Sequence, residues 1–360
     1  MLCSRSQVQV LKPERIIGSL IGTAMGDAIG LPYEGLSRQR GVRLLGAPER
    51  HRLFFGCGMV SDDTEHACMT AQALITSGGD IPLFRKHLAR RLRYWLLPLP
   101  AGVGLATARA ILRLWVGIRP ENSGVFSAGN GPAMRAPIIG VATDDLHALR
   151  ALVRASTRLT HTDEKAEFGA LAAALAAHLA CRQERVAGDD FLAQLRSLLA
   201  GEGEELMALM DAAVKAVQQG QDTQAFAASL GLERGVSGYM YHTLPVVIHA
   251  WLTHQHDVRA AIVTMVECGG DTDSTAAIVG GIVGAATGRQ GIPAEWCDRL
   301  LEWPRSIRWM EQLGSMLGAD PAIGSKKPVP ELFFPAVLLR NLFFLAVVLF
   351  HGFRRLLPPY

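Results

Sequence analysis

The chain has 360 residues and a mass of 38.8 kDa; 49% of the residues are hydrophobic, 19% are charged, and the net charge is +3. This apolar content excludes a disordered chain, and the 37 glycines exclude a long coiled coil. A chain of this length buries about three quarters of its unfolded surface, so it needs no disulfide or metal in order to fold.

The positive charge is concentrated at the C-terminal end. Residues 326–360 hold five basic residues and a single glutamate, which leaves the rest of the chain close to neutral. A nucleic-acid-binding protein needs basic residues gathered on one face of its domain. We therefore expect no nucleic-acid partner.

Helical patterns dominate the chain, and alternating strand patterns are scarce. A first helix is expected from Pro13, because proline is tolerated in the first helical turn, and it should end at Leu31-Pro32. Further helices are expected over residues 65–77, 81–96, 104–116, 145–158, 163–183, 189–199, 204–219, 222–230, 258–268 and 275–287. The sequence predicts an all-α fold with long loops.

Composition changes once along the chain. Gly, Pro and Lys collect over residues 314–330 and a very apolar segment follows, so we predict one domain over residues 1–325 and a separate C-terminal segment over 326–360. The six cysteines show neither a C-x-x-C pair nor a zinc-like spacing, which is typical of buried thiols in a reducing compartment. The start of the chain has no apolar core of a secretory signal, and a cytoplasmic location is expected.

Two short acidic runs each precede an expected helix. The first is SDDT at residues 61–64, and the second is GGDTDS at residues 269–274. Either run has a simple structural interpretation, because Ser, Asp and Thr cap helix N-termini and acidic groups favour the positive end of the helix dipole. The second run, however, carries two carboxylates and two hydroxyls where one cap is sufficient.

The apolar flanks of GGDTDS predict that its carboxylates are buried, and no Lys or Arg lies next to them in the sequence. Buried carboxylates without partners are costly, and Mg²⁺ binds carboxylate, hydroxyl and water oxygens. If the two runs meet in space, their four aspartates predict a site for two metal ions about 3.5–4 Å apart. The small-residue stretch 276–287 is shorter than the ~20 residues that span a bilayer, so its glycines predict close helix packing.

Three further features are candidate ligand contacts. The turn Gly129-Asn130-Gly131 precedes an expected helix, where backbone N–H groups could hold a phosphate. His161 precedes a long helix, and Glu34 follows the first one. Each also has an ordinary interpretation, as a turn, a capping histidine and a solvated glutamate.

Taken in order, these motifs resemble the ADP-ribosylglycohydrolase family, which includes the dinitrogenase reductase-activating glycohydrolases. The resemblance covers residues 14–310 and rests on GTAMGDAIGLPYEG (22–35), SDDT (61–64), GNGPAMR (129–135), TRLTHTDEKAEFGA (157–170) and ECGGDTDSTAAIVGGIVGA (267–285).

The resemblance implies an all-α fold with a binuclear Mg²⁺ or Mn²⁺ centre. It also implies hydrolysis of the bond between ADP-ribose and an acceptor, usually a protein side chain, which releases ADP-ribose. At matching positions the metal ligands are Ser61, Asp62, Asp63, Asp271, Asp273 and Ser274, and the phosphate loop is Gly129–Gly131 with His161 as a further ligand contact.

Glycosidic cleavage passes through an oxocarbenium-like transition state that carboxylates stabilise, and a metal ion lowers the pKa of a bound water. The candidates for the catalytic carboxylate are Asp62, Asp63, Asp273 and Glu34, and the sequence does not divide the roles among them. Two other functions remain open. One is a crystallin-like ADP-ribose-binding protein without catalysis, and the other is a metallohydrolase acting on a phosphate ester or a small ADP-ribosylated metabolite.

The resemblance does not extend to the C-terminal segment. Residues 332–350 read LFFPAVLLRNLFFLAVVLF, and basic residues flank them on both sides. Leu, Phe and Val favour insertion into a bilayer by about 0.3–0.6 kcal/mol each, whereas a central arginine opposes it by about 2.5–3.5 kcal/mol. We expect peripheral or anchored membrane association through residues 331–355, with catalysis left to residues 1–325. A packing helix is the alternative, although the Arg340-Asn341 pair should fit poorly in a dry core.

Overall fold

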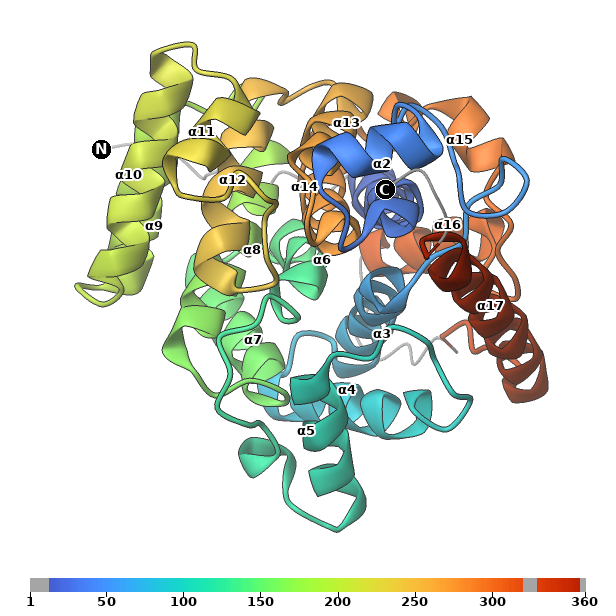
Figure 1. Cartoon of the computed structure of the whole chain (residues 1–360). Coiled ribbons are helices and arrows are strands. Elements are labelled where there is room, and N and C mark those ends of the chain that lie inside the picture. Colours follow the sequence, from blue (N-terminus) through green and yellow to red (C-terminus); the bar gives the residue numbers. More distant parts are fainter. Residues whose placement is uncertain (1–12, 320–328, 357–360) are drawn as a thin grey trace.

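The computed structural model describes residues 13–319 and 329–356, and these residues contain helices but no β-strands. The α-helices are α1 (Pro13–Gly30), α2 (Arg38–Leu45), α3 (Asp62–Ser77), α4 (Ile81–Trp95), α5 (Leu105–Trp115), α6 (Ala136–Ala142), α7 (Leu146–Arg158), α8 (Glu164–Ala180), α9 (Gly188–Leu199), α10 (Glu204–Gln218), α11 (Thr223–Ser229), α12 (Met240–Thr253), α13 (Val258–Cys268), α14 (Thr272–Thr287), α15 (Ala294–Asp298), α16 (Ile307–Gly318) and α17 (Phe334–Arg354). Four 3₁₀-helices complete the list: η1 (Leu31–Tyr33), η2 (Pro120–Asn122), η3 (Ala133–Arg135) and η4 (Arg289–Gly291). The predicted all-α fold is confirmed (Figure 1).

Helices α1 and α14 form the centre of the fold, and their backbones touch. Gly18, Gly22 and Gly26 of α1 recur every fourth residue, so they lie along one face of the helix. A Cβ added to Gly22 would overlap the carbonyl oxygen of Gly280 in α14. The glycines therefore allow a helix contact that larger side chains would prevent, as the small-residue pattern of 276–287 predicted.

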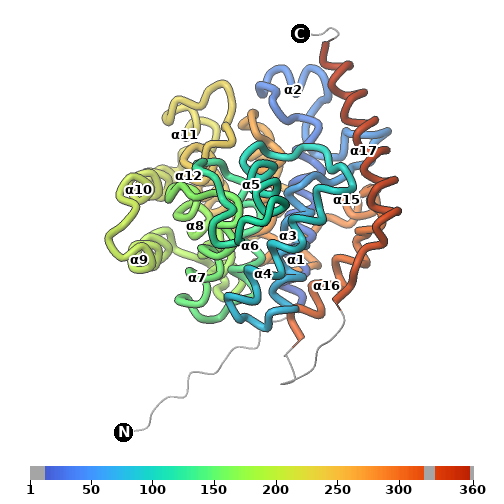
Figure 2. Tube along the Cα trace, turned by 90° about the horizontal axis from the view of Figure 1, so that it is seen from below, coloured from blue at the N-terminus to red at the C-terminus, as the bar shows by residue number. Residues whose placement is uncertain are grey.

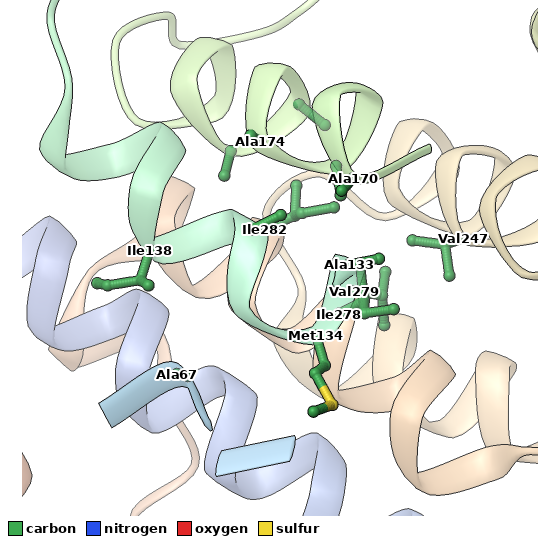
Figure 3. Packing of buried hydrophobic residues seen from close by; sticks show 14 of the residues in the cluster. Ala67, Ala133, Met134, Ile138, Ala170, Ala174, Val247, Ile278, Val279 and Ile282 are labelled. Carbon is green, nitrogen blue, oxygen red and sulfur yellow. The ribbon is translucent and has the colours of Figure 1, made fainter. Parts of the chain in front are cut away.

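The remaining helices pack around this pair with small and branched side chains. In Figure 3, Ala170 and Ala174 of α8 lie beside Ile282 and Val279 of α14. Every residue from Ala166 to Ala180 in α8 is buried, so α8 is a core helix throughout. This rigid centre supports the N-terminal ends of α3 and α14.

Helices α3 and α14 both begin three residues earlier than predicted. The prediction placed their starts at residues 65 and 275, whereas they begin at Asp62 and Thr272. Asp62, Asp63 and Asp273 thus lie in first helical turns, and the Ser61 hydroxyl accepts a hydrogen bond from the Asp63 backbone N–H. The capping interpretation is correct for Ser61, but it accounts for one residue of the run.

Helix α17 lies along the outside of the molecule, and one of its faces packs on the domain (Figures 1 and 2). The expectation that Arg340 and Asn341 fit poorly in a core was wrong, because both are buried with partners. Arg340 donates to the Glu302 carboxylate at 2.6 Å and lies 3.8 Å from Glu65. Asn341 Nδ2 donates to the carbonyl oxygen of Pro98 at 2.9 Å.

The outward face of α17 has the opposite character. Its exposed residues between 334 and 353 are all apolar: Phe334, Pro335, Leu339, Leu342, Leu345, Ala346, Leu349, Phe350, Gly352 and Phe353. Two described helices, α1 with η1 and α17, are long and apolar enough to cross a membrane, but the apolar stretch of the first is buried in the domain. The predicted boundary near residue 325 falls among residues 320–328, which lie outside the described residues.

We predict that Gly22→Ala lowers the free energy of unfolding by about 1–3 kcal/mol, because the added methyl group forces α1 and α14 apart. Chemical denaturation followed by circular dichroism measures the change. The control is Gly352→Ala in α17, where a Cβ meets no atom within 4 Å and alanine favours the helix by up to about 1 kcal/mol. Equal stability of the two variants would contradict the close packing of α1 and α14.

Candidate functional site

A cavity of about 380 Å³ opens at the N-terminal ends of α3 and α14. Five segments that are distant in the sequence contribute residues singled out above. The lining residues among them are Glu34, Ser61, Asp62, Gly129, Asn130, Gly131, His161, Asp271, Asp273 and Ser274. The structure therefore brings together every predicted site residue except Asp63 around one cavity, and Asp63 lies immediately behind it. The roles of these residues remain predictions.

Asp63 joins the two acidic runs. Its Oδ2 atom accepts hydrogen bonds from the hydroxyls of Ser61 and Ser274, each at 3.2 Å. Its Oδ1 atom is buried and has no hydrogen-bond partner among the residues that the structure describes. A buried carboxylate oxygen without a partner is costly, which is the situation that a cation at this position would relieve.

The sequence analysis did not single out Asp27, although it organises the first run. Asp27 is fully buried in α1, and its carboxylate accepts from the backbone N–H groups of Ser61 (2.9 Å) and Thr64 (3.1 Å) and from the Thr64 hydroxyl (2.5 Å). Burial raises its pKa to about 6 despite these hydrogen bonds. The available signal was an aspartate inside an otherwise apolar and small-residue helix.

The carboxylates of the cavity disfavour one another's charge. Burial raises the pKa values of Asp62, Asp63 and Asp273 well above the usual range, and neighbouring carboxylates raise them further. Burial also raises the pKa of Glu34, with the charge of Asp271 as the second cause. Without a cation, these carboxylates would destabilise the folded protein unless some of them were protonated.

The donor set suits a hard divalent cation, because carboxylate and hydroxyl oxygens are the ligands that Mg²⁺ and Mn²⁺ prefer. In the described part of the chain, no three His, Cys, Asp or Glu side chains are already gathered as they would be around a bound ion. Asp63 and Asp271 instead hold hydrogen bonds, the latter from Asn130 Nδ2 at 2.6 Å. A bound ion would therefore replace some of these bonds with metal–oxygen contacts.

The glycine turn and His161 form another part of the cavity lining. A Cβ on Gly131 would lie 3.2 Å from His161 Cε1, so the imidazole lies against the turn. Burial, and then the charge of Arg135, lower the pKa of His161 to about 3, which keeps the ring neutral at physiological pH. The backbone N–H groups of Gly129 and Asn130 already donate to Ser127 Oγ and the Gly238 carbonyl oxygen. These two amides are therefore not free donors for a phosphate.

Arg135, the last residue of the GNGPAMR motif, is a second residue that the sequence analysis did not select. Its buried guanidinium donates to the Gly131 carbonyl oxygen at 3.1 Å and to Thr160 Oγ1 at 2.8 Å. Thr160 Oγ1 in turn contacts His161 Nδ1 at 2.9 Å. Arg135 thus fixes the turn and the imidazole relative to each other.

The Glu34 loop is tied to the second acidic run by backbone hydrogen bonds. Gly35 N–H donates to the Gly270 carbonyl oxygen at 2.7 Å, and Gly270 N–H donates to the Leu36 carbonyl oxygen at 3.1 Å. A Cβ on Gly270 would overlap the backbone of Val236, and its φ of +85° also favours glycine. The GG pair therefore allows three chain segments to meet beside Asp271.

Comparison with known proteins agrees with this arrangement. The family model described as ADP-ribosylglycohydrolase matches residues 8–323. The chain belongs to the ADP-ribosylglycohydrolase family. As a member it is a hydrolase with ADP-ribosyl hydrolase activity, and the resemblance inferred from the five motifs is confirmed.

Several relatives of the chain in the ADP-ribosylglycohydrolase family are named hydrolases. The ADP-ribosyl-[dinitrogen reductase] glycohydrolase of Rhodospirillum rubrum is 27% identical over 85% of this chain and 98% of its own length. ADP-ribosylarginine hydrolase Tri1 of Serratia proteamaculans is 29% identical over 82% of this chain and 78% of its own. ADP-ribosylhydrolase ARH3 of Bos taurus is 25% identical over 78% of this chain and 87% of its own length.

A solved structure titled ADP-ribosylglycohydrolase-related protein complex shares the fold. It superposes with a TM-score of 0.63 at 26% identity, covering 85% of this chain and 97% of that one. Helix α17 begins at Phe334 and so lies beyond the region that the family model matches.

Proposed function

We propose that the chain hydrolyses the glycosidic bond between ADP-ribose and an acceptor, usually a protein side chain, and releases ADP-ribose. The main support is the cavity, in which both acidic runs, the glycine turn, His161 and Glu34 meet. The relatives named for ADP-ribosylated dinitrogen reductase and for ADP-ribosylarginine support a protein or arginine-linked substrate.

We further propose that two Mg²⁺ ions, or Mn²⁺, occupy the acidic side of the cavity. The ligands would be Ser61, Asp62, Asp63, Asp271, Asp273 and Ser274. The orphaned Asp63 oxygen and the mutually destabilised carboxylates support this assignment. When bound, such ions would orient the ribose hydroxyls and make a nearby water more acidic.

The position of each acidic residue in the cavity then indicates which of them could accept a proton. Asp62, Asp273 and Glu34 line the cavity and can reach a substrate or water, whereas Asp63 lies behind them and is held by two hydroxyls. A proton acceptor must contact the water that it activates, so Asp62, Asp273 and Glu34 are better candidates for that role than Asp63. Neutral His161 can exchange hydrogen bonds with a ligand but adds no charge to it.

We predict that Asp273→Asn lowers kcat by more than about 100-fold, since loss of even a residue that contacts a metal ligand costs 10- to 100-fold. The measurement is release of free ADP-ribose from arginine-, serine- and O-acetyl-linked ADP-ribose, with and without EDTA. The matched control is Asp190→Asn, an exposed carboxylate on α9. Full turnover by metal-free protein would contradict the metal proposal, and release only from small metabolites would contradict a protein substrate.

Metal binding also has a readout that does not depend on turnover. A raised carboxylate pKa contributes stability that is complete below the unfolded value near 4 and is lost as the pH rises through the folded value. Mg²⁺ binds the carboxylates after they have lost their protons. It should therefore raise the Tm of the wild type more at pH 8 than at pH 5.5. Asp273→Asn should reduce that shift, while Asp190→Asn should not.

A separate prediction concerns the glycine turn. Gly131→Asp should weaken ADP-ribose binding at least tenfold, or about 1.4 kcal/mol, because the new side chain crowds His161 and repels a diphosphate. Gly131→Ala adds the Cβ without the charge and should have a smaller effect. Calorimetry measures both, with Gly352→Asp as the control at an open position. An unchanged Kd would mean that the turn does not contact the ligand.

We also propose that the outward face of α17 contacts an anionic membrane surface. Its exposed residues are apolar from Phe334 to Phe353, and the exposed Arg354 is the last residue of the helix. Protein interfaces usually form about one hydrogen bond per 100–200 Å², which the apolar side chains of this face cannot provide. A lipid surface needs no such bonds.

The membrane test should leave the inner face of α17 intact. A chain stopped after Lys327 would lack Arg340 and leave Glu302 short of a partner, and breaking a buried pair costs about 3–5 kcal/mol. The triple variant Leu342→Gln, Leu345→Gln and Leu349→Gln changes exposed positions only. We predict that wild type sediments with phosphatidylserine vesicles and that the variant does not, whereas Leu83→Gln with Leu112→Gln, on α4 and α5, has no effect. If the wild type dimerises but does not bind vesicles, the membrane proposal is wrong and the outward face of α17 is an interface between two copies of the chain.

A further inference from the structure

The inner face of α17 reaches the cavity. Phe344 and Val348 line it, and Phe344 is packed in a small cluster with Leu31, Leu53 and Met59. We propose that α17 is one wall of the catalytic cavity and that Arg355 is a positioning residue that holds the Glu34 loop, so that the site of this chain is complete only with its C-terminal helix. This inference rests on the proposed hydrolase function.

Arg340 connects α17 to the first acidic run. Its Nη2 atom donates to the carbonyl oxygen of Val60 at 2.6 Å, and Val60 directly precedes Ser61. The same Nη2 atom pairs with Glu302, whose Oε2 also accepts from the Val60 N–H at 3.3 Å. The guanidinium and the carboxylate therefore hold both backbone groups of the residue that leads into SDDT.

Asn341 and Arg355 connect α17 to two other segments of the rim. Asn341 binds the carbonyl oxygen of Pro98, at the start of the loop that supplies Ala101 and Gly102 to the cavity. Arg355 donates from Nη1 to the Glu34 carbonyl oxygen at 2.8 Å and from Nη2 to that of Pro32 at 2.9 Å. Because Arg355 holds the backbone that carries the Glu34 side chain, we expect its main effect on the chemistry to pass through Glu34.

The backbone carbonyl oxygen of Arg355 is itself held from the domain. Arg40 of α2 donates to it at 2.6 Å, and the His351 ring one turn earlier contacts the carbonyl oxygen of Leu53. The end of α17 is thus held by α2 and by the segment that contains Leu53. The wall that α17 provides is apolar and lies next to Glu34, whereas the glycine turn and His161 form the polar wall. An acceptor group that leaves past Glu34 would contact Phe344 and Val348.

A double-mutant cycle tests the positioning role. We expect Arg355→Ala to lower kcat about 10- to 100-fold, because a small misplacement of a catalytic group has that effect, while the Kd for ADP-ribose changes less than about twofold. In a Glu34→Gln background the same substitution should change kcat less than about twofold, since the two act as one unit. Arg43→Ala, at an exposed position of α2, is the control. Independent, multiplicative losses would overturn the positioning role.

A second readout is independent of catalysis. Amide hydrogen exchange of residues 34–37 should become at least about tenfold faster in Arg355→Ala, with the Tm unchanged, because the loop loses two hydrogen bonds. Unchanged exchange would overturn the inference even if the enzyme is active. An inactive wild type with the expected exchange would instead contradict the proposed function.

The wall itself is tested by adding bulk from α17. Val348→Trp extends into the cavity, and Leu349→Trp places the same side chain on the exposed face one residue later. We expect the first to lower kcat/KM for an ADP-ribosylated protein at least about tenfold and the second less than about twofold, because only the first narrows the site. Equal values for the two variants would overturn the assignment of α17 as a wall.

Discussion

The backbone contact between α1 and α14 determines the geometry of the site. Because a Cβ at Gly22, Gly26 or Gly30 would overlap α14, the two helices can run at backbone distance only with glycine there. That contact places Asp27 of α1 beside the start of α14, and Asp27 in turn binds the backbone of Ser61 and Thr64. Two acidic runs separated by about two hundred residues therefore converge, because three helices are held by small residues and one buried carboxylate.

Two carboxylates on α3, Asp63 and Glu65, differ in whether an arginine side chain lies beside them. Burial raises the pKa of Asp63, and the nearby carboxylates raise it further. Two residues later, burial also acts on Glu65, but Arg305 at 2.8 Å and Arg340 outweigh it, so the pKa of Glu65 is lowered. The structure thus neutralises Glu65 with arginines from α17 and the segment before α16, whereas no arginine or lysine among residues 13–319 and 329–356 pairs with Asp63. The missing charge at Asp63 is the physical basis for proposing a metal there.

The sequence predicts those parts of the protein whose residues form a recognisable pattern within a short stretch of the chain. The core helices, the acidic runs and the glycine turn have compositions that are unusual for their position, and the structure brings them to one cavity. Asp27 and Arg135 were not selected, because most of their partners lie far away in the sequence: Asp27 binds Ser61 and Thr64, and Arg135 binds Ser156 and Thr160. Helix α12 was not predicted either, because Pro245 normally ends a helix, and here the surrounding core keeps it helical.

Helix α17 shows why mean hydropathy cannot orient a helix. Its two strongly polar mid-helix residues, Arg340 and Asn341, point inward beside Phe344 and Val347, whereas its exposed face is apolar, which departs from the usual pattern for a surface helix. This orientation depends on Glu302 and Glu65, which lie 38 and 275 positions before Arg340 and become its partners only in the folded chain. A buried ion pair gives little net stability compared with apolar packing but is specific in orientation, since any rotation of α17 would strand its charges. The same rotation would withdraw Phe344 and Val348 from the cavity, so the ion pair that orients the helix also maintains the wall of the site.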